Sequence, residues 1–323
     1  MQHQKGIALI TILIMVALAT ILAATIAKRQ WNTTENTAYL TRQNQSLLYA
    51  KSAEAFFSEI LLDDIQNASE SDHLKETWAQ PMPAFPVEDG YVTGIMEDES
   101  GKFNLNSLVK EDGTVNEVAK KWFEQILVRV GLPQQLSEAV IDWQDPDDIP
   151  VGAMGAEANY YQGLQQGYLP SNNLFYAVEE LKQVRGFEGK NYQLIEPYIS
   201  ALPQRDTQVN INTSPALVLA SLDANLQLNA VVSALEKQRS GLEHFKDVNE
   251  LWEIDEFKNI DDTVKTTFGA LLSVKSNFFK AKIEVKLGGR IKQFTSYFVR
   301  DDKAVNVVLR STVPFQNLNN SKQ

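Results

Sequence analysis

The chain has 323 residues, with 44% hydrophobic and 22% charged residues, an ordinary globular mixture long enough for a long helix and about two compact domains. Beyond Arg29 it holds 27 basic against 41 acidic residues, a balance that disfavours nucleic acid and anionic lipid as partners and tolerates cations such as calcium. The lack of cysteine excludes a disulfide framework, a thiol redox motif and a thiolate zinc site.

The first element is a run of 21 uncharged residues from Ile7 to Ala27, closed by Lys28 and Arg29. As a helix it would reach about 31 Å, close to the thickness of a bilayer's hydrocarbon core. A cleaved secretory signal is one alternative, and Ala17-Leu18-Ala19 would serve as its cleavage site, but such signals have a shorter apolar part of about 7–15 residues. A plain membrane anchor is the other alternative.

Gly6 stands before this run, directly after Lys5, so a cut after Gly6 would leave the helix on the product. This arrangement resembles the signal of type IV pilins and type II secretion pseudopilins, which a prepilin peptidase cuts after such a glycine. The resemblance implies a leader of residues 1–6 and an N-methylated Ile7. Flanking charge is balanced and does not set the orientation. The resemblance implies a single-pass inner-membrane anchor with a periplasmic head.

The fifth position after that cut is Thr11. Most pilin-like subunits carry a Glu there, which neutralises the terminal amine of a neighbouring subunit. An unpaired carboxylate in a bilayer costs about 2.5–3.5 kcal/mol on insertion scales, and a subunit with no neighbour above it has no amine to pair with. Thr11 therefore suits a fibre tip, a departure typical of the minor pseudopilin K family (GspK, general secretion pathway protein K). In an ordinary anchor, Thr11 would be a tolerated polar residue.

Helical patterning continues from Gln30 to about Leu62, without Gly or Pro after Ile7. The apolar face is predicted to pack on a sheet, and its residues are Leu40, Leu47, Leu48, Phe56, Phe57, Ile60 and Leu61. Residues 63–89, with three prolines, are predicted to form a loop, and residues 90–106 a β-hairpin. Glu117–Val130 and Gln134–Trp143 have helical patterns. Three strands follow near the C-terminus, over about 281–287, 290–300 and 305–313.

The predicted fold is α+β: a pilin-like long N-terminal helix packed on an antiparallel sheet, with a large all-α insertion that resembles sterile-alpha-motif and helix-hairpin-helix units. The expected organisation begins with a leader (1–6) and a transmembrane helix (7–29). The first part of a pilin head (30–106), an inserted α-domain (107–274) and the C-terminal sheet of the head (275–315) follow. A flexible tail (316–323) ends the chain.

The densest acidic cluster begins at Asp142, with four carboxylates in seven residues. Such charges repel one another unless they are solvated or bridged by a cation, and both alternatives remain open from the residues alone. The spacing is not that of an EF-hand. The stretch from Asp142 to Tyr161 resembles the corresponding stretch of the K family, which implies a calcium site. The expected ligands are Asp145, Asp147, Asp148 and Glu157. Asp142 is left out because its side chain can face back into its own helix.

A second pattern is repeated. Residues 179–190 resemble a helix-hairpin-helix turn, Val209–Leu222 predicts a strand leading into a helix capped by Thr213 or Ser214, and residues 245–251 repeat the aromatic entry and helical Leu. Such hairpins can hold DNA phosphates, so a membrane-anchored periplasmic DNA-binding or uptake protein is the alternative function. The acidic balance and Glu188 within the hairpin stand against it.

No catalytic residues are predicted, since the three histidines are scattered and no nucleophile motif occurs. The resemblance instead implies a minor pseudopilin of a type II secretion system, which exports folded proteins across the outer membrane. Its implied partners are the minor pseudopilins I and J, the major pseudopilus subunit and the prepilin peptidase. Together with I and J it would form the pseudopilus tip and initiate assembly. An anchored globular domain with no assembly role is the third possibility.

Overall fold

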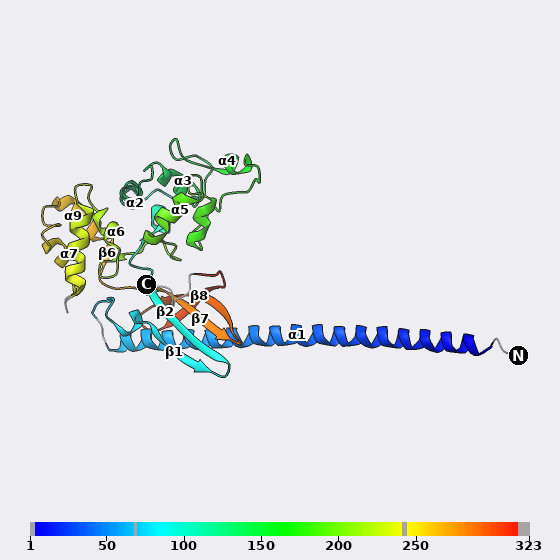
Figure 1. The fold of residues 1–323 in the computed structure, drawn as a ribbon. Coiled ribbons are helices and arrows are strands. Elements are labelled where there is room, and N and C mark those ends of the chain that lie inside the picture. The colour runs from blue at the N-terminus through cyan, green and yellow to red at the C-terminus, as the bar shows by residue number, and fades with distance from the viewer. Residues whose placement is uncertain (1–3, 68–69, 241–243, 316–323) are drawn as a thin grey trace.

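The spine of the molecule is one uninterrupted helix. The computed structural model describes residues 4–67, 70–240 and 244–315, and its helix α1 runs over 63 residues from Gln4 to Gln66 (Figure 1). No helix-breaking proline interrupts its backbone hydrogen bonds. The segment from Ile7 onward is long and apolar enough to cross a membrane, and its side chains are exposed as far as Thr37.

The second half of α1 lies across one face of a five-stranded sheet (Figure 1). The strand order is β1-β2-β7-β8-β9, and all neighbours are antiparallel. The strands are β1 (Met82–Val87), β2 (Gly90–Asp98), β7 (Phe278–Leu287), β8 (Arg290–Arg300) and β9 (Val305–Ser311). β2 and β7 pair from Gly90 opposite Leu287 to Asp98 opposite Phe279. Gly90 has no room for a side chain, because a Cβ would lie 1.7 Å from the Lys286 carbonyl oxygen.

The core of this pilin-like head is formed by one stripe of α1. Phe57 and Leu61 are buried in a cluster with sheet residues such as Ile283. Each fully buried side chain of this kind stabilises the fold by about 1.5–3 kcal/mol. The predicted apolar face is too wide, since Leu40, Leu48 and Phe56 are exposed. The sheet covers only the narrow stripe of residues spaced by three and four positions.

Between β2 and β7 lies a helical insertion with two lobes (Figure 1). A two-residue parallel bridge closes each lobe: β3 (Phe103–Asn104) with β4 (Ile199–Ser200) in lobe 1, and β5 (Val209–Asn210) with β6 (Leu272–Ser273) in lobe 2. Lobe 1 contains η2 (Leu105–Leu108), α2 (Glu117–Arg129), α3 (Leu136–Asp142), α4 (Ala158–Gln162), η3 (Val178–Gln183), α5 (Lys190–Ile195) and η4 (Glu196–Tyr198). Lobe 2 contains α6 (Ala216–Ala220), α7 (Leu228–Ser240), α8 (Asn249–Glu253) and α9 (Asp262–Gly269). The two lobes share one hydrophobic core.

Both lobes use the same asparagine clamp. In lobe 1 the Asn106 side chain donates to the Phe175 carbonyl oxygen (3.0 Å) and accepts from the Phe175 amide (2.8 Å). In lobe 2 Asn212 makes the same pair of bonds with Phe245, at 2.9 and 2.8 Å. These bonds satisfy buried backbone groups that no strand or helix pairs.

The sequence after each clamped phenylalanine is also repeated, at an offset of 70 residues. The matching pairs are Val178 and Val248, Glu180 and Glu250, Leu181 and Leu251, Val184 and Ile254, and Phe187 and Phe257. The segment before the phenylalanine differs in length, because 68 residues separate Asn106 from Phe175 and only 32 separate Asn212 from Phe245. The acidic cluster lies in the longer segment, so it belongs to lobe 1 alone.

The structure confirms the predicted fold class, the helices α2 and α3, and the C-terminal strands, but it contradicts the hairpin over residues 90–106. β2 pairs with β1 and β7, whereas Phe103–Asn104 joins β4 in lobe 1. The turn at Asp98–Gly101 thus leads out of the sheet. Gly101 lies against lobe 2, since a Cβ there would be 2.5 Å from the Thr213 hydroxyl.

The predicted loop over 63–89 is also wrong in part, because α1 continues to Gln66 and β1 occupies residues 82–87. β1 is an edge strand, where Pro83 and Pro86 are tolerated since one side of the strand needs no partner. The predicted cap of α6 is wrong as well: Pro215 occupies the N-cap position. The Thr213 hydroxyl donates instead to Asp98, at 2.5 Å. The predicted flexible tail, 316–323, lies outside the described residues.

Candidate metal centre

Three carboxylates meet where α3 leads into the loop before α4. The last turn of α3 continues past its end at Asp142, because the Asp145 amide donates to the Ile141 carbonyl oxygen (3.0 Å). Asp142 and Asp145 therefore project from the same side of one helical turn. Glu157 returns to them at the N-terminus of α4. One carboxylate oxygen from each residue lies within 4.8 Å of the other two.

These carboxylates are buried and incompletely hydrogen-bonded. Asp142, Asp145 and Glu157 are 0, 4 and 3% exposed. The Val151 amide donates to Asp142 Oδ1 (3.0 Å). Asp142 Oδ2, Asp145 Oδ1 and both Glu157 oxygens have no hydrogen-bond partner within the described residues. A buried polar atom without a partner is strongly unfavourable, so these oxygens require either protons or a cation.

The electrostatics of the cluster point the same way. Burial first, and then the charges of Asp142 and Asp145, raise the pKa of Glu157 to about 8. Burial and the charge of Asp142 likewise raise the pKa of Asp145 to about 7. Burial also raises the pKa of Asp142. Each group therefore resists ionisation next to the others unless a positive charge lies between them.

The donor set fits calcium. It consists of carboxylate oxygens only, and calcium takes about six to eight oxygen ligands, so backbone carbonyls and water would supply the remainder. Gly155 brings the loop backbone against Asp142, since a Cβ at Gly155 would lie 2.5 Å from Asp142 Oδ2. The solvated acid cluster that the sequence left open does not describe these three residues, because they are buried.

The predicted ligands divide into two groups. Asp145 and Glu157 lie in the cluster. Asp147 and Asp148 are exposed and lie outside it, although their charges raise the pKa of Glu157, and Asp147 accepts from the Ile149 amide (2.7 Å). Asp142, expected to face its own helix, is the third member of the cluster. Its spacing of three from Asp145 was the signal that would have identified it.

The raised pKa values predict how pH affects the metal-free protein. A carboxyl whose pKa is higher in the folded than in the unfolded state contributes stability below its unfolded pKa, and this is lost as pH rises through the folded value. Without divalent cations, the helical insertion should therefore become less stable between about pH 5 and pH 8, where Asp145 and Glu157 lose their protons. Thermal unfolding in chelator across that range measures this. A flat profile would show that the cluster is not buried as described.

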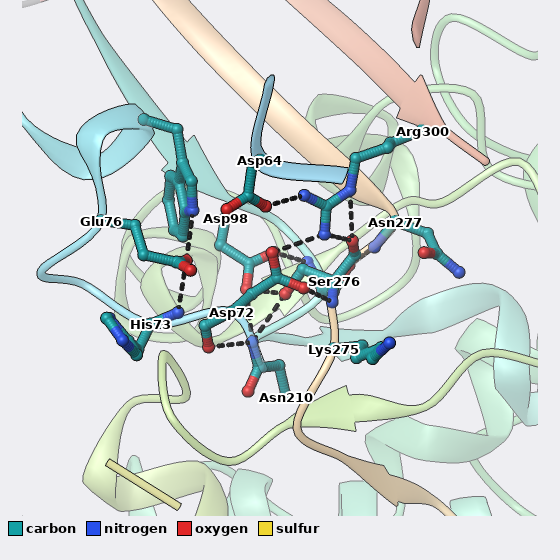
Figure 2. Close-up of polar contacts among 12 residues, drawn as sticks. Asp64, Asp72, His73, Glu76, Asp98, Asn210, Lys275, Ser276, Asn277 and Arg300 are labelled. Atoms are coloured by element: carbon teal, nitrogen blue, oxygen red, sulfur yellow. Dashed lines mark hydrogen bonds and ion pairs between the residues drawn. The ribbon is translucent and has the colours of Figure 1, made fainter. Parts of the chain in front are cut away.

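A second group of carboxylates already pairs with a positively charged side chain of the protein. Figure 2 shows Asp64, Asp72 and Glu76 close together, with Arg300 beside the two aspartates. Arg300 pairs with Asp64 (2.6 Å) and with Asp72 (2.5 Å). Glu76 accepts from the Trp78 indole (2.6 Å) and from the His73 amide (2.9 Å). The guanidinium thus supplies the positive charge for the two aspartates, and Glu76 is satisfied by hydrogen bonds.

Two of the three histidines, which appear scattered in the sequence, meet in the structure. The His73 and His244 rings lie 4.0 Å apart, centroid to centroid. Burial lowers the pKa of both imidazoles. Neither belongs to a group of three or more metal-ligating side chains in the part of the chain that the structure describes. His3 lies outside the described residues.

The expected processing residues lie at the start of α1. Gly6 and Ile7 are in its first turns, and the leader residues 1–3 lie outside the described residues. The Thr11 hydroxyl is within hydrogen-bond distance of the carbonyl oxygens of Ala8 (2.9 Å) and Ile7 (3.1 Å). Thr11 therefore satisfies its polar group within its own helix.

The hairpin that resembles a phosphate-binding turn is engaged internally. The Gly186 amide, which would face a phosphate, donates to the Glu188 carboxylate (3.1 Å). Arg185 of the same turn donates to the Gly155 carbonyl oxygen (3.0 Å) and so supports the loop of the acidic cluster. Both contacts indicate a structural use of the hairpin.

Comparisons with known proteins agree with this architecture. Residues 101–204 and 209–275 match two models of the family described as type II secretion system (T2SS), protein K. The matched segments correspond closely to lobes 1 and 2. The chain is 31% identical to type II secretion system protein K of Aeromonas hydrophila, over 96% of this chain and 97% of that protein. It is 32% identical to the Pseudomonas aeruginosa protein of the same name, over 95% of this chain and 92% of that protein.

The fold is also similar to that of a solved structure. It is the crystal structure of the GspK-GspI-GspJ complex from the type 2 secretion system of enterotoxigenic Escherichia coli, and the matched chain has a TM-score of 0.78. The match covers 87% of the present chain and 100% of that chain, at 23% sequence identity.

Proposed function

Because this chain belongs to the type II secretion system protein K family, we propose that it is the minor pseudopilin at the tip of the pseudopilus. The observation that carries the tip position is Thr11. Its hydroxyl is satisfied within α1, so the subunit needs no neighbouring amine above it in the fibre. The bulky helical insertion supports the same position, since a head of this size is hard to repeat along a filament (Figure 1).

Its partners are the minor pseudopilins I and J, with which it caps and nucleates the pseudopilus for export of folded proteins. The related chain of known structure was solved with its own I and J subunits. The exposed apolar half of α1 is the surface through which such subunits pack, and it anchors the protein in the inner membrane before assembly. The head then lies in the periplasm, and the major pseudopilus subunit follows below the tip. The role is structural, without catalysis.

The acidic cluster holds calcium in this proposal. Asp142, Asp145 and Glu157 are the protein ligands, and the ion would replace the protons that their buried oxygens otherwise need. Asp147 and Asp148 lie close enough to raise the local negative charge and attract the cation.

Cleavage after Gly6 tests the pilin-like role. The variant Gly6→Phe, produced in a cell with its own prepilin peptidase, should accumulate as uncut precursor, because a large side chain blocks the scissile position. Mass spectrometry of the N-terminus measures the outcome: the wild-type chain should begin at methylated Ile7. The control is Ala19→Phe, which alters the competing Ala17-Leu18-Ala19 site and should leave processing unchanged. Normal processing of the Gly6 variant would reject the proposal.

DNA binding through the hairpins is disfavoured, because Glu188 already occupies the Gly186 amide. A gel-shift assay at moderate salt separates the two functions. The secretion role predicts no shift of the DNA band, and a shifted band would favour the DNA-binding function instead.

A further inference from the structure

A buried polar junction joins the helical insertion to the head. We name it the lobe–head junction, and its residues are Asp64, Asp72, Asp98, Asn210, Thr213, Ser276 and Arg300. Figure 2 shows most of these side chains converging from the end of α1, the ends of β2 and β8, the start of lobe 2 and the segment before β7. Most of them are less than 9% exposed.

Arg300 organises the head side of the junction. Besides Asp64 and Asp72, it donates to the Ser276 carbonyl oxygen from Nη2 (2.6 Å) and Nε (3.1 Å). Asp64 belongs to the last turns of α1, so the guanidinium ties the end of the spine helix to the segment that leads from lobe 2 into β7. Charge-assisted bonds of this kind are short and directional.

Asn210 organises the lobe side. Its side-chain amide donates to the Ser276 hydroxyl (2.7 Å) and to the Asp72 carbonyl oxygen (3.0 Å), and lies 3.4 Å from Asp98 Oδ2. The neighbouring Thr213 hydroxyl donates to the same Asp98 oxygen (2.5 Å). The first residues of lobe 2 thus dock into the head through donors aimed at buried acceptors.

Comparison of the two repeated lobes shows that Asn210 binds the head, whereas the equivalent residue of lobe 1 does not within the described residues. Its counterpart in lobe 1 is Asn104, and both asparagines accept from the amide two residues later, at 2.9 Å in lobe 2 and 3.1 Å in lobe 1. The amide ends differ. Asn104 donates to the Gln204 carbonyl oxygen (2.7 Å) and the Thr207 hydroxyl (3.0 Å), both within the insertion. The same turn residue therefore stabilises the insertion in lobe 1 and reaches out of it in lobe 2.

We propose that Asn210 is the positioning residue that fixes the orientation of the helical insertion on the head, by linking lobe 2 through Ser276 and Asp72 to Arg300 and the end of α1. Lobe 1 follows, because both lobes share one core. A displacement of the spine helix then moves the insertion as one body with it. This inference rests on the proposed tip function for its biological use, while its test concerns geometry alone.

The test uses the absence of cysteine. Ser233 on α7 and Lys51 on α1 are exposed, so Ser233→Cys and Lys51→Cys give a single pair of spin-label sites in the full-length chain in detergent. Double electron–electron resonance then measures the distance distribution between lobe 2 and the spine. Asn210→Asp keeps the acceptor for the turn, removes the two N–H donors and places a charge beside Asp98. The control Asn104→Asp makes the same change in lobe 1.

The wild-type distribution should be narrow. Asn210→Asp should broaden it about twofold or more, because a folded insertion released from the head samples several orientations. Asn104→Asp should leave it unchanged. Thr213→Val preserves the shape of the side chain and the turn but removes the hydroxyl that donates to Asp98. It should broaden the distance distribution less, and it replaces Asn210→Asp as the test if that variant does not fold. A narrow, wild-type distribution in the folded Asn210 or Thr213 variant would overturn the inference. Uncut precursor or absent tip assembly would bear on the proposed function and not on this geometry.

Discussion

Removal of divalent cations should lower the melting temperature of the helical insertion by roughly 5–15 °C. A ligand at 100–1,000 times its Kd stabilises the folded state by about 2.7–4.1 kcal/mol. Each kcal/mol changes the melting temperature of a domain of this size by about 2–4 °C. The physical reason is the set of four buried oxygens on Asp142, Asp145 and Glu157 that find no hydrogen-bond partner in the part of the chain that the structure describes. Thermal unfolding of the full-length chain in chelator, and again after calcium is restored, measures the shift. Trp143, which packs on Tyr161 beside the cluster, contributes to the tryptophan fluorescence that follows the unfolding.

Two variants locate the ion. Glu157→Gln should abolish the calcium-dependent shift. Above about pH 8, where Glu157 is ionised in the metal-free protein, the same variant should be more stable than the wild type in chelator, because it removes one buried charge from a repelling group. Asp147→Asn is the matched control: it neutralises an exposed carboxylate of the same loop and should keep most of the shift. Equal melting curves in chelator and in calcium for the wild-type chain would eliminate the metal site.

Arg300→Met should destabilise the head by about 3–5 kcal/mol, the usual loss when one partner of a buried ion pair is removed. Arg300 is 7% exposed, and removal of its guanidinium leaves Asp64 and Asp72 without their cation. The loss should be smaller at pH 5 than at pH 8. Burial already raises the pKa of Asp64 to about 6, and protonation relieves the unpaired charge.

Chemical unfolding followed by tryptophan fluorescence, to which Trp78 in the head core contributes, measures the effect of Arg300→Met. The comparison variant is Arg310→Met, whose arginine forms its one ion pair among the described residues with Glu54 and is 28% exposed at its side chain. Its loss should be smaller, since Ser296 continues to donate to Glu54. Adding Asp64→Asn and Asp72→Asn to Arg300→Met should recover part of the stability. A loss no larger than that of Arg310→Met would contradict the role of the junction.

Much of the fold is readable from local sequence patterns. The spine helix follows from the absence of breakers between Ile7 and Leu62, and the meander of β7, β8 and β9 follows from strict alternation and the Gly288-Gly289 turn. The helices α2 and α3 follow from apolar spacing and from their ending residues. These patterns act over a few residues, so they survive in any context that buries one face.

The metal centre was only partly predictable. The acidic loop is conspicuous in the sequence, and it drew attention to Asp145 and Glu157. The composition of the loop does not distinguish exposed from buried carboxylates. The sequence therefore predicts Asp147 and Asp148 as ligands together with Asp145 and Glu157, and it does not predict Asp142. Burial depends on the packing of α3, α4 and the turn at Arg185, and these lie up to about 50 residues apart in the chain.

By itself, the sequence determined the membrane-length helix, the acidic loop and the strand-forming tail of the head. Only the tertiary structure decided that β2 pairs with β7 rather than with residues 103–106, that Asp142 completes the carboxylate cluster, and that His73 meets His244. It alone decided that Asn210 leaves its own lobe to bind the head. The reason is physical, because each of these contacts joins groups that are distant in the chain. Which partner a group finds depends on which buried polar atoms still need a hydrogen bond once the whole chain has packed.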